Sequence, residues 1–207
     1  MTTMLSDCGL VTRDSNFLCF NYPEPAAIDP QTIHTVFRRI PRFSGHTFEM
    51  YNVAQHSELV AELMQEHYPD RPELVLPALL HDVHEMYSGF GDVILPAKQF
   101  LRAYTPALDL LERAIDHAVA ARFNFPVHLF YDPCVKEMDR LAVAIEARDV
   151  MVKPPDELMW YNDLPLISGK YAQERFIPTS HYPSFSQLRL FDCEFTPLIK
   201  TFENAEL

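Results

Sequence analysis

The sequence lacks the patterns that mark secreted and membrane proteins. It has no apolar stretch near the roughly 20 residues that a membrane helix needs. Its N-terminus has no basic region followed by an apolar segment, so a signal peptide is not expected. No CxxC pair occurs, and the four cysteines are isolated: Cys8, Cys19, Cys134 and Cys193. A cytoplasmic protein with reduced thiols and no membrane partner is therefore predicted.

Basic residues are scarce as well. Seventeen Lys and Arg stand against 29 Asp and Glu, which gives a formal net charge of −12. The longest basic run is Arg38-Arg39, whereas binding to long nucleic acid needs a surface that neutralises many phosphates. We therefore expect no long nucleic acid as a partner. A small anionic ligand stays compatible with the composition, because a bound metal and a few local bases can hold it.

Glycine is rare and proline is frequent, with five Gly against 17 Pro. This ratio favours helices joined by Pro-rich connections. Residues 1 to about 28 are expected to be irregular, and no alternation typical of strands or internal repeat is found. Apolar residues at three- and four-residue spacing predict helices over about 29–39, 49–67, 73–87, 105–123 and 133–151. Pro77 is expected either to kink the third of these helices or to mark its effective start.

The predicted fold class is all-α, in a single domain over residues 1–207. The helical core is expected at about 15–151. Prolines, aromatic residues and short polar runs dominate the sequence after residue 151, and we expect a C-terminal arm there, at 152–207, with a short helix near 186–202.

Four ionisable residues interrupt helices that otherwise present apolar faces: His56, the adjacent pair His81-Asp82, and Asp139. Taken singly, each has a simpler interpretation, such as a core histidine bonded to the backbone. Burying ionisable groups is costly unless something pairs with them, and two imidazoles with two carboxylates can hold one divalent metal. Such a site commonly hydrolyses a substrate. This N/O ligand set suits Mn, Co, Zn, Fe or Ni, with Mg as a further option, better than Ca.

These residues form an H…HD…D signature, and the motifs around them resemble those of the HD-domain phosphohydrolases. The matching segments follow in the family's order: RFSGHT at 42–47, YNVAQHS at 51–57, LLHD at 79–82, Glu85, GD at 91–92 and PAK at 96–98. The resemblance covers about residues 15–151. It is to the YfbR-like 5′-deoxynucleotidases and to phage dATP triphosphohydrolases of the DatZ type.

The resemblance implies a helical HD-domain bundle that hydrolyses a small-molecule (deoxy)nucleotide at its 5′-oxygen–phosphorus bond. The products would be a nucleoside with phosphate or, from a triphosphate such as dATP, a deoxynucleoside with triphosphate. Related small HD proteins are commonly dimers or larger, which implies a homo-oligomer. The resemblance assigns the metal ligands as His56, His81, Asp82 and Asp139.

The same resemblance gives roles to residues around the metal. Glu85 would orient or deprotonate the attacking water, or assist the leaving oxygen, and Asp92 would lie near the water or the sugar. Three further residues would touch the substrate: Arg42 and Lys98 at the phosphate, where Arg can engage two oxygens at once, and Phe43 against the base or sugar. His46 either caps its loop or touches the substrate, and His84 is interpreted as lying behind the site or on the surface.

Two features depart from the family pattern. The second acid follows the HD aspartate by ten residues, from Asp82 to Asp92, where relatives usually have eight. Phe43 stands where relatives carry Trp or Tyr. Two alternatives remain open: hydrolysis of another phosphate ester, such as a cyclic nucleotide or guanosine tetraphosphate, and a catalytically silent scaffold that binds metal or nucleotide. Met86 after Glu85 argues against the tetraphosphate, because its hydrolases tend to carry paired acids there.

Overall fold

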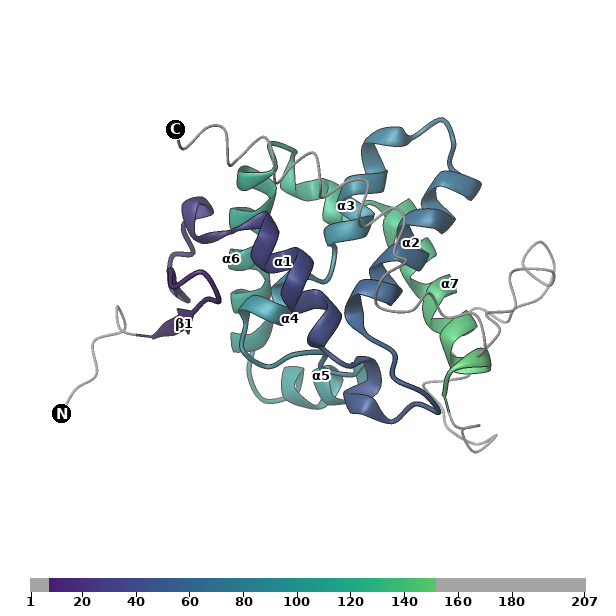
Figure 1. Ribbon diagram of the computed structural model, residues 1–207, viewed down its shortest axis with the longest axis horizontal. Coiled ribbons are helices and arrows are strands. Elements are labelled where there is room, and N and C mark those ends of the chain that lie inside the picture. The colour runs from purple at the N-terminus through teal and green to yellow at the C-terminus, as the bar shows by residue number, and fades with distance from the viewer. Residues whose placement is uncertain (1–7, 152–207) are drawn as a thin grey trace.

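Helices make up most of the chain that the computed structural model describes, residues 8–151 (Figure 1). This agrees with the all-α class in outline. None of the helices in this range is both long and apolar enough to cross a bilayer. The predicted C-terminal arm and its short helix lie outside the described residues. The helices are α1 (Pro30–Val36), α2 (Val53–His67), α3 (Val75–Leu80), α4 (Val83–Tyr87), α5 (Leu95–Arg102), α6 (Ala107–Arg122) and α7 (Pro133–Asp149).

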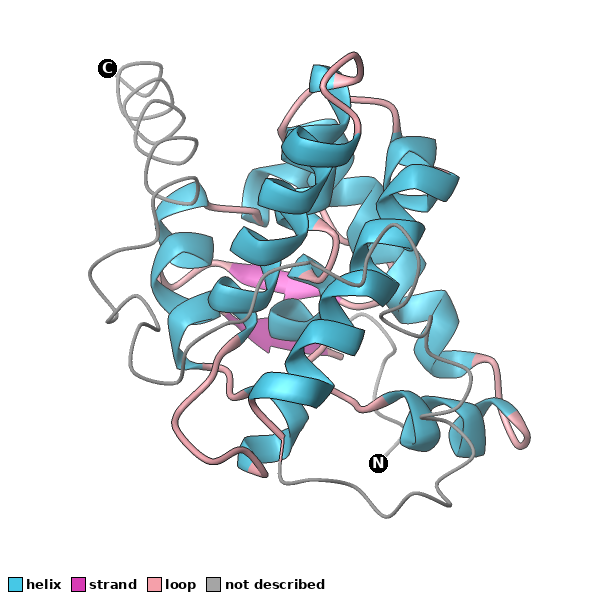
Figure 2. Ribbon diagram, turned by 90° about the vertical axis from the view of Figure 1, so that its right-hand side faces the viewer, coloured by secondary structure: helices cyan, strands magenta, loops and turns pink. Residues whose placement is uncertain are grey.

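A small antiparallel hairpin precedes the helices, so the expectation of an irregular N-terminal region was wrong here. Strand β1 (Gly9–Val11) pairs with β2 (Phe17–Cys19), with Leu10 opposite Leu18 (Figure 2). Strands of three residues are too short to show alternation in the sequence. The buried Leu18 side chain anchors the hairpin to the helical core.

Two helices illustrate how local capping sets their boundaries. At α1 the Asp29 carboxylate accepts a hydrogen bond from the Thr32 amide at 2.6 Å, and Pro30 occupies the first helical position. Helix α2 begins at Val53 rather than at 49, because Asn52 and Gln55 form a capping box with reciprocal bonds of 3.0 Å.

The segment predicted as one helix over 73–87 is divided, and Pro77 lies near a helix start, as one of its two interpretations expected, rather than at a kink. A 3₁₀ turn over Pro72–Leu74 leads into α3, which ends at Leu80, and α4 starts at Val83. Pro77 lies in the first turn of α3, where the missing amide would have no helical partner. The break falls at His81-Asp82, so the two side chains are not held to the 100° offset of neighbouring helical residues.

Helix α2 lies between α3 and α7, and the apolar faces of the three helices form one core cluster. A second cluster joins α1, α3, α4 and α6. The first cluster includes Val60 and Met64 of α2, Ala78 of α3, and Met138 and Ala142 of α7, all fully buried. These helices carry the residues predicted to bind metal, so apolar packing fixes where those residues meet.

Candidate metal centre

Four polar atoms from three parts of the chain converge on one point. His56 comes from α2, His81 and Asp82 from the break between α3 and α4, and Asp139 from α7. The two imidazole Nε2 atoms are 3.2 Å apart. Asp82 Oδ2 lies 3.4 Å from Nε2 of His56 and 3.3 Å from that of His81, and Asp139 Oδ1 lies 3.3 and 3.6 Å from the same atoms.

These separations fit a single divalent ion. With ligand bonds of about 2.1 Å, neighbouring ligands lie roughly 3.0 Å apart in octahedral and 3.4 Å apart in tetrahedral coordination. The observed atom pairs span 3.2–3.6 Å. Two nitrogen and two carboxylate donors form a set that transition metals bind well.

The other ring nitrogen of each histidine is held by an acceptor. Nδ1 of His56 donates to Glu146 Oε1 at 2.7 Å, and Nδ1 of His81 donates to the Ala78 carbonyl oxygen at 2.7 Å. These bonds place the proton on Nδ1 and turn the Nε2 lone pair of each ring toward the common point. Outer partners of this kind orient metal-binding histidines.

Glu146 is a site residue that the sequence analysis missed. Its side chain has no exposed surface, and it also accepts a hydrogen bond from the Tyr51 hydroxyl at 2.8 Å. Although burial raises the pKa of Glu146, the charges of His56 and Arg42 lower it overall, so the carboxylate stays ionised. The signal was available, because Glu146 lies two helical turns beyond Asp139 and therefore on the same face.

The charges of the cage compensate one another when no metal is bound. Burial lowers the pKa of His81, but the charge of Asp82 and the hydrogen bond to Asp139 raise it to about 10. The same contacts lower the pKa of Asp82 and of Asp139 against the effect of burial. In the metal-free cage, protonated imidazole thus supplies the positive charge that a bound cation would otherwise provide.

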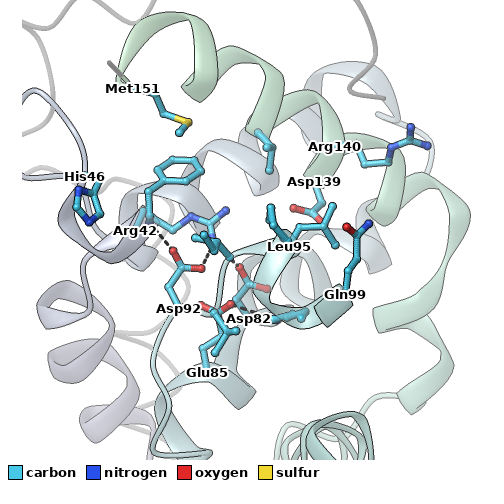
Figure 3. Close-up of a pocket in the computed structure, with 16 residues that line it drawn as sticks. Arg42, His46, Asp82, Glu85, Asp92, Leu95, Gln99, Asp139, Arg140 and Met151 are labelled. Carbon is cyan, nitrogen blue, oxygen red and sulfur yellow. Dashed lines mark hydrogen bonds and ion pairs between the residues drawn. The ribbon is translucent and has the colours of Figure 1, made fainter. Parts of the chain in front are cut away.

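The cage opens on a cavity of about 670 Å³ (Figure 3). Most of the residues predicted for the site line it: Arg42, Phe43, His46, Asp82, Glu85, Asp92, Lys98 and Asp139. The two histidine ligands lie behind this surface. Its apolar wall is formed by Val93, Ile94, Leu95, Pro96, Val143 and Met151, and Gln99 and Arg140 complete it.

Asp92 reaches the site despite the longer spacing, and both of its carboxylate oxygens are engaged. Oδ1 accepts from Arg42 Nη1 at 2.8 Å, and Oδ2 accepts from the Phe43 amide at 2.5 Å. Phe43 and Ser44 have φ values of 53° and 52°, which are uncommon for residues with a side chain. Asp92 therefore stabilises a strained loop at the cavity, while its catalytic role stays a prediction.

Arg42 is buried among three acids. Besides Asp92, its guanidinium lies 3.5 Å from Asp82 and 3.6 Å from Glu146. It also lies over the Phe43 ring, with 5.3 Å between the guanidinium carbon and the ring centroid. Arg42 thus links the loop to the metal cage, and its binding of phosphate remains a prediction.

Glu85 is almost fully buried at the cavity wall. Its Oε1 lies 3.5 Å from Lys98 Nζ, and its Oε2 has no hydrogen-bond partner among residues 8–151. Burial and the charges of Asp82 and Asp92 raise the pKa of Glu85 well above its ordinary value. Such a group is suited to proton transfer. His84 is buried beside the site, as one of its two interpretations expected, and one of its ring nitrogens lies within 4.8 Å of a carboxylate oxygen of Asp82 and of Glu85.

Comparisons with known proteins add one relative. No family model matches the sequence. The chain is 31% identical over 137 residues to YfdR of Escherichia coli (strain K12), which is described as an uncharacterized protein. The match covers 66% of this chain and 66% of YfdR.

Proposed function

We propose that this protein is a metal-dependent phosphohydrolase of the HD-domain type that cleaves the 5′-oxygen–phosphorus bond of a (deoxy)nucleotide. The observation that carries the proposal is the convergence of His56, His81, Asp82 and Asp139 within 3.2–3.6 Å at the wall of a cavity. Glu85, a buried acid with one unpartnered oxygen in the described chain, lines that same cavity. The order of its sequence motifs gives independent support.

The four residues of the cage would hold the ion. When bound, a divalent ion lowers the pKa of water and neutralises phosphate charge. Glu85 would accept a proton from the attacking water or hand one to the leaving 5′ oxygen. A bond forms between the water oxygen and phosphorus, the bond to the 5′ oxygen breaks, and that oxygen leaves protonated as the nucleoside hydroxyl. Lys98 and Arg42 supply positive charge for the phosphoryl oxygens.

The charges that line the cavity favour a monophosphate over a triphosphate. Four acids line the cavity, Asp82, Glu85, Asp92 and Asp139, against three Lys and Arg side chains, and two of these, Arg42 and Lys98, are already paired with acids. A phosphate monoester carries only about two negative charges, whereas a triphosphate needs more cations to balance it. The apolar wall of the cavity is suited to the base and sugar.

Product analysis tests this proposal. Metal-stripped protein is incubated with each dNMP, dNTP, NMP and NTP, with a cyclic nucleotide and with guanosine tetraphosphate, with and without Mn, Co, Zn or Mg. We expect metal-dependent release of nucleoside and phosphate from a monophosphate. Release of triphosphate would overturn the preference for monophosphates. If every nucleotide survives with every metal, the proposed activity is wrong and a silent binding scaffold becomes the better interpretation.

A further inference from the structure

Lys98 is held in the cavity wall more closely by an acid from α6 than by any residue of the predicted site. Its Nζ lies 3.1 Å from Glu112 Oε1, compared with 3.5 Å from Glu85 Oε1. Burial lowers the pKa of Lys98, but the charges of Glu85, Asp82 and Glu112 raise it overall, so the ammonium keeps its charge. Lys98 therefore joins Glu112 to Glu85.

Helix α5 has little apolar packing to hold it. None of its residues is buried, and Leu95, Phe100 and Leu101 are exposed to solvent. Its other described link to α6 is the exposed pair of Arg102 with Asp109. Exposed pairs stabilise little. The pair of Lys98 with Glu112, whose side chains are only 15% and 12% exposed, is thus the stronger described attachment between α5 and α6.

Glu112 has His84 and Asp116 as neighbours on its other side. His84 Nε2 lies 3.7 Å from Glu112 Oε1 and has no hydrogen-bond partner within the described range. Its Nδ1 donates to Asp116 Oδ1 at 2.9 Å, and Asp116 lies one turn beyond Glu112 on α6. The Tyr131 hydroxyl donates to the other Asp116 oxygen at 2.6 Å. The His84 imidazole is thus fixed by Asp116 and lies beside Glu112.

We propose that Glu112 is a positioning residue that fixes the Lys98 ammonium beside Glu85, with His84 and Asp116 supporting Glu112. Glu112 does not line the cavity and therefore acts only through Lys98. Fixed in this way, Lys98 engages Oε1 of Glu85 and leaves Oε2 for the water or the leaving oxygen. The effect on turnover rests on the proposed function, whereas the placement of Lys98 does not.

A double-mutant cycle tests the action through Lys98. We expect Glu112→Gln to lower kcat about tenfold, with KM changed less than about threefold and metal affinity unchanged. In a Lys98→Met background, the same substitution is expected to change kcat less than about twofold, because the residue through which Glu112 acts is gone. An equal fall in both backgrounds would show a merely structural role and overturn the proposal.

Two further variants separate positioning from folding. Asp109→Asn removes an acid from the exposed side of α6 and is expected to leave kcat unchanged. Glu112→Asp keeps the charge on a shorter side chain and is expected to give a kcat between those of wild type and Glu112→Gln. The contrary result would be a kcat of Glu112→Asp as low as that of Glu112→Gln, with the melting temperature of wild type. The retained negative charge would then not hold Lys98, and the proposal would be wrong.

A measurement independent of activity separates this inference from the proposed function. The sequence has five lysines, and a buried, hydrogen-bonded ammonium gives a ¹⁵N–¹H signal that exposed lysines lose through exchange. The Lys98 signal, assigned by its loss in Lys98→Met, is expected in wild type and absent in Glu112→Gln. Its persistence in Glu112→Gln would overturn the inference. If wild type hydrolyses nothing, the proposed function fails while this signal still decides the placement of Lys98.

Discussion

The two walls of the cavity are held in place by different kinds of contact. The metal ligands rest on α2, α3 and α7, whose apolar side chains are buried in one cluster, and on short bonds to Glu146 and Ala78. The opposite wall consists of α5, which buries no residue, and the strained loop at Phe43. Its cations, Arg42 and Lys98, are placed by ion pairs with acids.

This difference has a consequence for substitutions. Apolar packing keeps the backbone of each metal ligand in place when a polar neighbour is changed, so such a change affects only the orientation of the side chain, and substitution of the ligand itself mainly removes its bond to the metal. A cation that is positioned by acids moves when any of those acids is replaced. Substitutions in this wall therefore alter both the position of the cation and the local charge.

The largest effect is expected for Asp139→Asn, which keeps the shape of the side chain and removes a charged ligand. We expect metal affinity to fall more than about 100-fold and turnover about 1,000-fold, because loss of one anionic ligand weakens the whole cage. Calorimetric metal titration and product chromatography measure the two effects. Asp109→Asn is the control, and wild-type metal affinity in Asp139→Asn would contradict the assignment of this ligand.

Glu85→Gln is expected to lower kcat by about 100- to 1,000-fold, the usual contribution of a positioned acid or base. Metal affinity should stay within about twofold of wild type, since Glu85 is not part of the cage. Glu73→Gln, in an exposed pair with Arg71, is the matched control. Unchanged turnover in Glu85→Gln would remove Glu85 from the mechanism.

Glu146→Gln tests the support behind the first wall. Loss of the charged acceptor for His56 is expected to weaken metal binding about 10- to 100-fold, the usual effect of an outer partner. Glu137→Gln removes an acid on the same helix that pairs with Tyr68, and it should leave metal binding unchanged. Equal effects of the two variants would mean that α7 as a whole, not the His56 contact, was disturbed.

Arg42→Lys tests the support behind the second wall. Lysine keeps the charge but cannot reach Asp92, Asp82 and Glu146 at once, so we expect the free energy of unfolding to fall by about 1–3 kcal/mol. Turnover should fall about tenfold through the displaced loop. Arg102→Lys, in the exposed pair with Asp109, should cost less than about 0.5 kcal/mol in denaturant unfolding. Equal losses would show that the Arg42 contacts contribute little.

The effect of pH on the metal-free cage can be measured without any substitution. Because its contacts raise the pKa of His81 from 6.5 to about 10, the protonated imidazole stabilises the fold fully below pH 6.5 and loses this contribution as pH rises through 10. The melting temperature of stripped protein should therefore fall between pH 7 and 10. Metal displaces this proton, so its affinity should rise by up to about tenfold per pH unit. An affinity independent of pH would contradict this account.

The sequence by itself determined the helical class, the approximate extents of α1, α6 and α7, and the identity of the residues that meet at the cage. Periodicity and caps are local, so α1, α6 and α7 could be located from residues close to them in the chain. The motif order likewise indicated His56, His81, Asp82 and Asp139 before any geometry was known.

Only the tertiary structure decided how those residues are supported. The break at His81-Asp82 has no strong local signal, since Pro77 is the more obvious helix breaker. Glu146, Glu112 and His84 act through partners on other helices, and a single residue in an amphipathic helix does not reveal its long-range partner. Arg42 and Asp92 are 50 positions apart, yet one ion pair between them positions the loop at the cavity. Packing creates these pairs, and the local pattern of residues does not encode them.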